Sequence, residues 1–156
     1  MKMRIEGLKQ VDEALKDLPK ATAKGVVRRV LRRRAEPMAM LTARLAPVDT
    51  SDLANSIEIT TRLTPRQRRY QRSKGYNIGA DAVVLYVGSS SPVAHLQEFG
   101  TRHHAAQPFM RPAFEQLKYR VLDGIQKDLM NEIEKSKARQ ARKAARIARR
   151  QALGLE

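Results

Sequence analysis

The chain of 156 residues contains no cysteine and no tryptophan, and its only aromatic residues are four Tyr and three Phe. Without cysteine, neither a disulfide framework nor a thiolate-ligated metal site can form. With so few aromatics, a core must be built mainly from Leu, Ile, Val, Met and Ala. The hydrophobic fraction of 42% is enough for one compact domain with an appendage.

Long apolar runs are also missing from the sequence. No stretch approaches the roughly 18 apolar residues that a bilayer-spanning helix needs. Residues 1–6 alternate charged and apolar side chains, which is unlike the apolar run of a secretion signal. We therefore expect no membrane association and no export.

Motifs for catalysis are absent as well, since the sequence holds no G-x-S-x-G, H-E-x-x-H or phosphate-loop pattern. His95, His103 and His104, taken together with Glu98, match no zinc-ligand spacing. We predict that the protein is not an enzyme and that it requires no metal and no cofactor.

Positive charge is abundant, with a formal net charge of +15, and it is concentrated in three runs that contain no acidic residue. The runs cover residues 20–34, 62–74 and 135–155, and together they hold 21 of the 31 basic residues. The rest of the chain is therefore mildly acidic. Basic runs of this kind favour an anionic partner, either nucleic acid or an acidic protein surface.

Hydrophobic spacing predicts short strands at residues 1–6, 57–63 and 83–87 and helices at residues 8–18, 21–45 and 93–99. Pro37 predicts a kink or break near Ala35–Glu36 in the second helix, because proline removes one helical hydrogen bond. That helix is expected to bury an apolar stripe made of Val27, Leu31, Met38, Leu41 and Leu45. Thr50 or Ser51 is expected to cap a short turn that begins at Asp52.

The polar and basic residues 64–80 predict a long hairpin loop. A last helix is expected from Arg111 to Ala152, with a stripe of Phe114, Leu117, Val121, Ile125, Leu129 and Ile133 that fades into alanines. The predicted fold class is α+β, a small antiparallel sheet packed against two long helices, with a projecting basic C-terminal helix. We place one domain at residues 1–134 and a basic, helical extension at residues 135–156.

Two segments carry a resemblance to a known family. The first runs from Ala46 to Ile57 and reads A-P-V-D-T-S-D-L-A-N-S-I. The second contains A-H-L-Q-E-F-G-T at residues 94–101, followed by A-Q-P-F-M-R-P-A-F at residues 106–114. The chain resembles the phage morphogenesis proteins typified by the gene-ten product of an HK-type lambdoid phage. In this chain Ser51 stands where that family usually has glycine, and Val93 stands where Tyr is common.

The resemblance, which covers residues 1–133, implies a structural virion protein of a tailed bacteriophage. Such a protein forms an oligomeric ring, expected to be a hexamer, that joins head to tail in the neck or completes and terminates the tail. Its partners would be adjacent neck and tail proteins, and packaged DNA in the channel contacted without sequence specificity. It would be located in the virion, and in the host cytoplasm during assembly.

Two sets of residues are candidates for contacts. Subunit or partner contacts are expected from the motif residues Glu98, Phe99, Gly100, Thr101, Phe109 and Arg111. Contacts to DNA or to an acidic partner are expected from the basic residues Arg66, Arg68, Arg69, Arg72, Lys74, Arg139, Arg142, Lys143, Arg146, Arg149 and Arg150.

Two alternatives stay open at this level. Phe109, which lies between Pro108 and Pro112, could anchor its own core or a neighbouring subunit. The whole protein could instead be a free basic nucleic-acid-binding protein, which the isoelectric point near 10.8 permits. The basic tail, however, contains no aromatic residue and no recognised binding motif.

Overall fold

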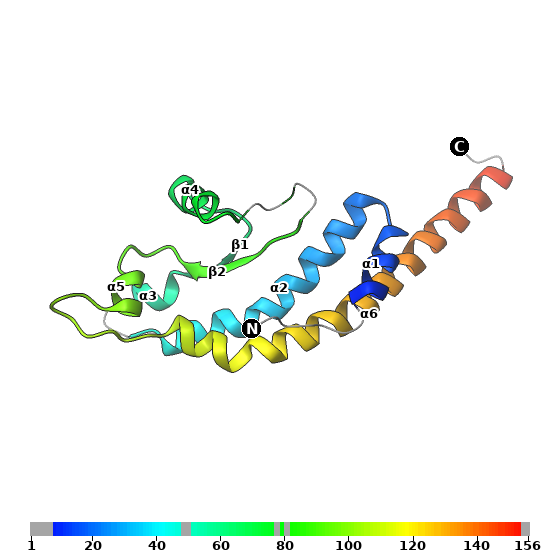
Figure 1. Cartoon of the computed structure of the whole chain (residues 1–156). Coiled ribbons are helices and arrows are strands. Elements are labelled where there is room, and N and C mark those ends of the chain that lie inside the picture. Colours follow the sequence, from blue (N-terminus) through cyan, green and yellow to red (C-terminus); the bar gives the residue numbers. More distant parts are fainter. Residues whose placement is uncertain (1–7, 48–50, 77–78, 80–81, 154–156) are drawn as a thin grey trace. The chain divides into compact units, whose positions relative to one another are not determined.

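The computed structural model describes residues 8–47, 51–76, 79 and 82–153 (Figure 1). Its helices are α1 (Leu8–Lys16), α2 (Lys20–Leu45), α3 (Asp52–Asn55), α4 (Pro65–Ser73), α5 (Ala94–Phe99) and α6 (Met110–Ala152). Its strands are β1 (Ile57–Thr60) and β2 (Tyr86–Ser89). The α+β class, the antiparallel sheet and the long C-terminal helix are confirmed. The strand expected at residues 1–6 lies outside the described residues.

The chain forms two compact units. Unit 1 consists of residues 1–30 and 122–156, and unit 2 consists of residues 31–121. The long helices α2 and α6 each contribute one part to unit 1 and the other to unit 2. The domain boundary expected at residue 134 stays a prediction, and α6 continues through that position without interruption.

The core of unit 1 is formed by one face from each of three helical segments. Val11 and Leu18 come from α1 and the turn after it, Val26 and Val30 from α2, and Leu129 and Ile133 from α6, and all are buried. The pairs from α2 and α6 are four residues apart and Val11 and Leu18 are seven apart, so each pair lies on one face at helical spacing. The spacing expected for α1 and for the second half of α6 is thereby confirmed.

Ion pairs tie α6 to the other segments of unit 1. Glu132 is buried and accepts a 2.9 Å hydrogen bond from Nη1 of Arg29 on α2. Lys137 donates to Asp17 at 2.7 Å from the exposed surface of the same helix. Buried carboxylates require such partners, because removing the charge from water is otherwise strongly unfavourable.

The fully buried residues of α2 are not those of the predicted apolar stripe, whose first four members are half-buried. Beyond Val26 and Val30, the buried positions are Thr42 and, just after the helix, Ala46. Leu45 is 37% exposed and Met40 is 73% exposed. Thr42 can be buried because its hydroxyl donates a 2.7 Å hydrogen bond to the Met38 carbonyl, so no polar atom is left unsatisfied.

Of the kink or break expected near Ala35–Glu36, the break is wrong. The helix runs continuously from Lys20 to Leu45 with Pro37 inside it. Proline forfeits one intrahelical hydrogen bond, but the packing along both halves of a 26-residue helix is sufficient to keep it continuous.

The sheet of unit 2 is a single antiparallel pair, in which Ile57 is opposite Ser89 and Thr60 is opposite Tyr86. Both strands are shorter than expected, and the second lies three residues later than the alternation at Val83, Leu85 and Val87 indicated. Because side chains alternate between the faces, Glu58 and Thr60 share one face with Tyr86 and Gly88. Ile57, on the other face, packs against the core of unit 2.

That core contains Ala46, Leu53, Ala94 and Phe109, with Met110 packed beside them. Phe109 is 0% exposed, so its ring is anchored in the core of its own chain. Ala113 is likewise fully buried on α6, whereas Phe114 is 49% exposed. The expected stripe of α6 was therefore wrong at its first position, by one residue.

Residues 64–80 do not form one long loop, because Pro65–Ser73 is helix α4. The signal for this helix is the sequence Thr64-Pro65-Arg66-Gln67. The Thr64 hydroxyl accepts from the Gln67 N–H at 3.3 Å, and Gln67 Oε1 accepts from the Thr64 N–H at 3.0 Å. This is a capping box, with proline at the first helical position where its missing N–H does no harm.

The last part of α6 is helical to Ala152, as expected, and is almost fully solvated. Ser136 is buried and Gln140 is half-buried, but every side chain from 141 to 152 is exposed. Alanine and arginine favour helix strongly, which compensates for the lack of packing.

Ser51 precedes α3 with φ of 62°, the left-handed conformation that side chains with a Cβ disfavour. Its hydroxyl makes no capping hydrogen bond, so only its backbone carbonyl serves the helix, by accepting from Asn55 N–H. Replacing Ser51 with glycine should therefore raise the free energy of unfolding by about 1 kcal/mol, as measured by urea denaturation. Ser90→Gly, at a position without positive φ, should give no gain. An equal effect of both substitutions would contradict the strain argument.

Helix α4 buries no residue, so its capping box should determine whether it forms. Thr64→Ala should destabilise α4 by about 1 kcal/mol, because the Gln67 N–H loses the hydroxyl that accepts its hydrogen bond. Amide hydrogen exchange at Arg68–Arg72 should accelerate roughly fivefold while exchange at Val30 and Ile133 stays unchanged. Thr61→Ala, three residues upstream, serves as the control and should leave all rates unchanged.

Candidate interaction surfaces

The Glu98 carboxylate organises the motif at residues 94–114. Glu98 is 3% exposed at the end of α5, and its two oxygens accept backbone N–H groups from the first turn of α6. Phe109 and Met110 donate to Oε2 at 2.8 and 2.9 Å, and Arg111 donates to Oε1 at 3.1 Å. N–H groups at the start of a helix have no intrahelical partner. The Glu98 carboxylate, which is more than ten residues away in the sequence, therefore caps α6, and its negative charge interacts favourably with the positive end of the helix dipole.

The Arg111 side chain also binds Glu98, and we call the Glu98 carboxylate with its backbone donors and Arg111 the Glu98 clamp. Its Nε lies 3.2 Å from Glu98 Oε1, and its Nη2 donates to the Glu98 carbonyl at 3.3 Å. The same guanidinium lies 4.9 Å from the centre of the Phe99 ring. Phe99 is 69% exposed, so one face of the ring is stabilised by the cation while the rest is open to solvent.

Gly100 allows the chain to return to Glu98. Its φ is 75°, and a Cβ at this position would lie 2.8 Å from the Ala106 nitrogen. The Cβ of any other residue would therefore collide with the backbone of the loop at Ala106 and displace it. Two backbone hydrogen bonds close the loop, from Thr101 N–H to the His104 carbonyl and from Gln107 N–H to the Gln97 carbonyl, each 2.8 Å long.

The clamp also sets the charge state of Glu98. Burial, the largest single influence, raises the pKa of this carboxyl, but the three backbone N–H groups and the Arg111 guanidinium together outweigh it. The pKa of Glu98 is therefore lowered from its ordinary value. The group stays ionised through the neutral range and keeps its capping role there.

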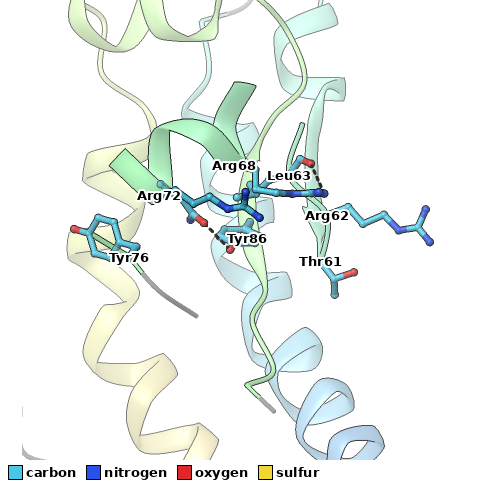
Figure 2. Close-up of a pocket in the computed structure, with 8 residues that line it drawn as sticks. Thr61, Arg62, Leu63, Arg68, Arg72, Tyr76 and Tyr86 are labelled. Carbon is cyan, nitrogen blue, oxygen red and sulfur yellow. Dashed lines mark hydrogen bonds between the residues drawn. The ribbon is translucent and has the colours of Figure 1, made fainter. Parts of the chain in front are cut away.

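Helix α4 and the nearby strand ends enclose a pocket of about 290 Å³ (Figure 2). Two tyrosines, Tyr76 and Tyr86, and three arginines, Arg62, Arg68 and Arg72, contribute to its lining. Tyr86 donates to Gln71 Oε1 at 3.2 Å, and Arg68 Nη2 donates to the Leu63 carbonyl at 3.5 Å. In Figure 2, Arg68 and Arg72 extend across the pocket from α4, whereas Arg62 points away from them.

A larger groove of about 920 Å³ brings together residues from both predicted sets. Glu98, Phe99 and Arg111 line it together with Arg66 of α4. The sheet face that carries Glu58, Thr60 and Gly88 contributes to the same groove. Gly100, Thr101 and Phe109 do not line it, and Phe109 is buried behind the clamp.

The basic residues of the tail belong to the other unit. Arg139, Arg142, Lys143, Arg146, Arg149 and Arg150 are all exposed on the last turns of α6 in unit 1. They form an open helical surface.

Two of the histidines have contacts within unit 2. His104 Nε2 lies 3.1 Å from Gln97 Oε1 within the closed loop, and His95 lines the groove. In the part of the chain that the structure covers, no group of three potential metal ligands gathers. None of the helices there has the length and apolarity that crossing a bilayer requires.

Comparison with known protein families shows which family the chain belongs to. The family described as bacteriophage HK97-gp10, a tail component, matches residues 9–100. This chain belongs to the HK97-gp10-like family. The match covers more than half of the chain and includes the segment 46–57 and Glu98 to Gly100, so the resemblance noted above is confirmed. No curated protein and no solved structure matches the chain.

Family membership makes the protein a structural component of a bacteriophage, located in the virion, where it contacts other virion proteins. The matched region ends at Gly100, so Phe109, Arg111 and the tail lie beyond it. The Glu98 clamp joins the two sides of that boundary, since its acceptor is inside the match and its donors are outside.

Sequence reasoning missed several residues of these surfaces. Arg62, Gln71 and Tyr86 of the small pocket were not among the predicted contacts, because a loop at residues 64–80 gave no reason to expect a pocket between this segment and the strand ends. The capping box at Thr64 was the signal that could have revealed the helix and so the pocket. Nothing in the sequence pattern showed that Glu98 caps a helix that begins twelve residues later.

Removing the charge of Glu98 should weaken the clamp. Glu98→Gln should lower the free energy of unfolding by about 2 kcal/mol, because a charged acceptor of several hydrogen bonds becomes neutral. Urea denaturation at pH 7 measures the effect. The control is Glu115→Gln, which removes the exposed ion-pair partner of Lys118 within α6. It should change the free energy of unfolding by less than about 0.5 kcal/mol.

The same pair of variants checks the pH dependence. Because the folded-state pKa of Glu98 is lowered, its contribution is fully present above the unfolded value of about 4.3 and is lost as the pH falls through the folded pKa. The native protein should therefore lose stability between about pH 5 and pH 3 more steeply than Glu98→Gln does. Parallel curves for the two proteins would contradict this assignment.

Proposed function

We propose that this phage component forms an oligomeric ring, of six subunits, in the head–tail neck or at the completed end of the tail. The observation that carries the proposal is the match to a family of tail components across residues 9–100. In such a ring each subunit presents one surface to its neighbour and others to adjacent virion proteins.

Exposed apolar side chains of unit 2 support contacts between subunits. They lie on α5, on the residue before it and on the first turns of α6, and comprise Val93, Leu96, Phe99, Phe114 and Tyr119, each between 39% and 69% exposed. Large apolar side chains that are exposed on a protein from an assembly favour burial against another chain.

The motif residues divide into two roles in this proposal. Glu98, Gly100 and Phe109 hold the loop and the start of α6 in place from within. Phe99, Thr101 and Arg111 are exposed and provide the contact surface. An aromatic ring fixed by a guanidinium loses little conformational freedom on binding, which suits a contact residue.

The basic surfaces contact anionic partners. Helix α4, with Arg66, Arg68, Arg69, Arg72 and the following Lys74, presents one such surface, and the extension from residue 135 presents the other. The extension buries almost nothing in its own chain. An acidic face of a neighbouring protein and packaged DNA in the channel are both partners of suitable charge.

Light scattering after size exclusion tests the ring. In 0.5 M salt and after nuclease treatment, the protein should give one discrete mass of several subunits. Phe99→Ser should shift the mass towards the monomer, because an exposed aromatic contact is lost. Tyr70→Ser, which removes a similarly exposed aromatic from α4, should keep the oligomer. A monomer that binds DNA tightly as salt is lowered would favour a free nucleic-acid-binding protein instead.

A further inference from the structure

The pocket beside α4 has an unusual concentration of unpaired cations. Arg62, Arg68 and Arg72 line it, and none of them forms an ion pair with a carboxylate of the described residues. Among the residues that the structure describes, the one hydrogen bond from these guanidiniums is the 3.5 Å contact of Arg68 with the Leu63 carbonyl. Most of their donor groups are therefore directed to solvent.

The position of these charges on α4 is unfavourable for the isolated chain. Arg68 and Arg72 are four residues apart, so they lie on the same face of the helix and repel each other. Arg66 and Arg68 are in the first turn, where the helix dipole favours negative charge, and that turn contains no acidic residue. A bound anion on this face would relieve both effects.

The other lining groups indicate which anion fits. Tyr76, which is 68% exposed, and Tyr86 both line the pocket. Tyr70, 64% exposed on α4, lines the adjoining groove with Lys74 at 5.7 Å from its ring. Guanidiniums next to open aromatic faces suit a nucleic acid strand, in which phosphates alternate with flat bases. An acidic peptide would use the cations but not the rings.

We propose that this pocket binds a phosphate of a DNA strand, with Arg68 and Arg72 as its ligands and Tyr76 stacked on the neighbouring base. The planar guanidiniums donate to the phosphate oxygens, while the Tyr86 hydroxyl stays bonded to Gln71 and links β2 to α4 beside the site. Binding is independent of base sequence, because every contact is to phosphate or to the face of a base. The inference rests on the proposed function, in which α4 contacts an anionic partner.

Fluorescence anisotropy of a labelled 20-nucleotide oligothymidylate with the full-length protein tests the pocket. Arg68→Gln and Arg72→Gln should each weaken binding about tenfold at 0.15 M salt, because one charge-assisted contact is lost. Each should also reduce the slope of log affinity against log salt by about 0.7. Tyr76→Ala should weaken binding about tenfold through loss of stacking.

Arg66→Gln is the matched control. It removes the same charge from the same helix but from a residue that does not line the small pocket, and it should weaken binding only about twofold. Equal losses for Arg66, Arg68 and Arg72 would overturn the proposal in favour of a diffuse basic surface. Displacement of the probe by poly-glutamate as efficiently as by unlabelled oligothymidylate would overturn it in favour of an acidic protein partner.

The mass of each preparation is measured alongside. If the Arg66, Arg68 and Arg72 variants lose affinity equally while the oligomer is intact, only the phosphate site is contradicted. A monomer whose DNA binding still depends on Arg68 and Arg72 counts against the ring alone. The two proposals can therefore fail separately.

Discussion

The ionised Glu98 side chain is the constraint on which unit 2 depends. Its carboxylate takes up the free N–H groups at the start of α6, and this can happen only because Gly100 lets the chain turn back without a side chain in the way. Once the start of α6 is fixed, Phe109 is placed in the core and Arg111 is placed over Phe99. One charge thus links a short helix, a loop, the longest helix and an exposed aromatic ring.

Patterns that depend on local chemistry were read correctly from the sequence. The spacing of Val11 and Leu18, the stop at Gly100 and the helical tail to Ala152 follow from propensity and from backbone geometry, which act over a few residues. The α+β class followed from the same patterns. The family resemblance located the clamp residues, although it implied contact roles for them and the structure shows that Glu98 and Phe109 are interior.

Patterns that depend on tertiary packing were not available from the sequence. In α2, Thr42 is fully buried because its hydroxyl bonds its own backbone, whereas the leucines of the predicted stripe are half-buried or exposed, so apolar spacing did not identify the most buried positions. The pocket beside α4 was hidden because composition was given more weight than capping: a segment rich in arginine looked like a loop, although Thr64 and Gln67 specify a helix start. The pairing of Tyr86 with Gln71 joins positions that no periodicity relates.

Helix α4 carries no buried side chain, yet it has a defined start and a partner on β2. Its surface is therefore uncoupled from the packing that holds the fold together, and most substitutions on it should be nearly neutral for stability. A segment of this kind can exchange one set of charges for another without a compensating change in the core. Natural selection can therefore retune what the protein contacts through a nine-residue helix while the scaffold beneath it stays the same.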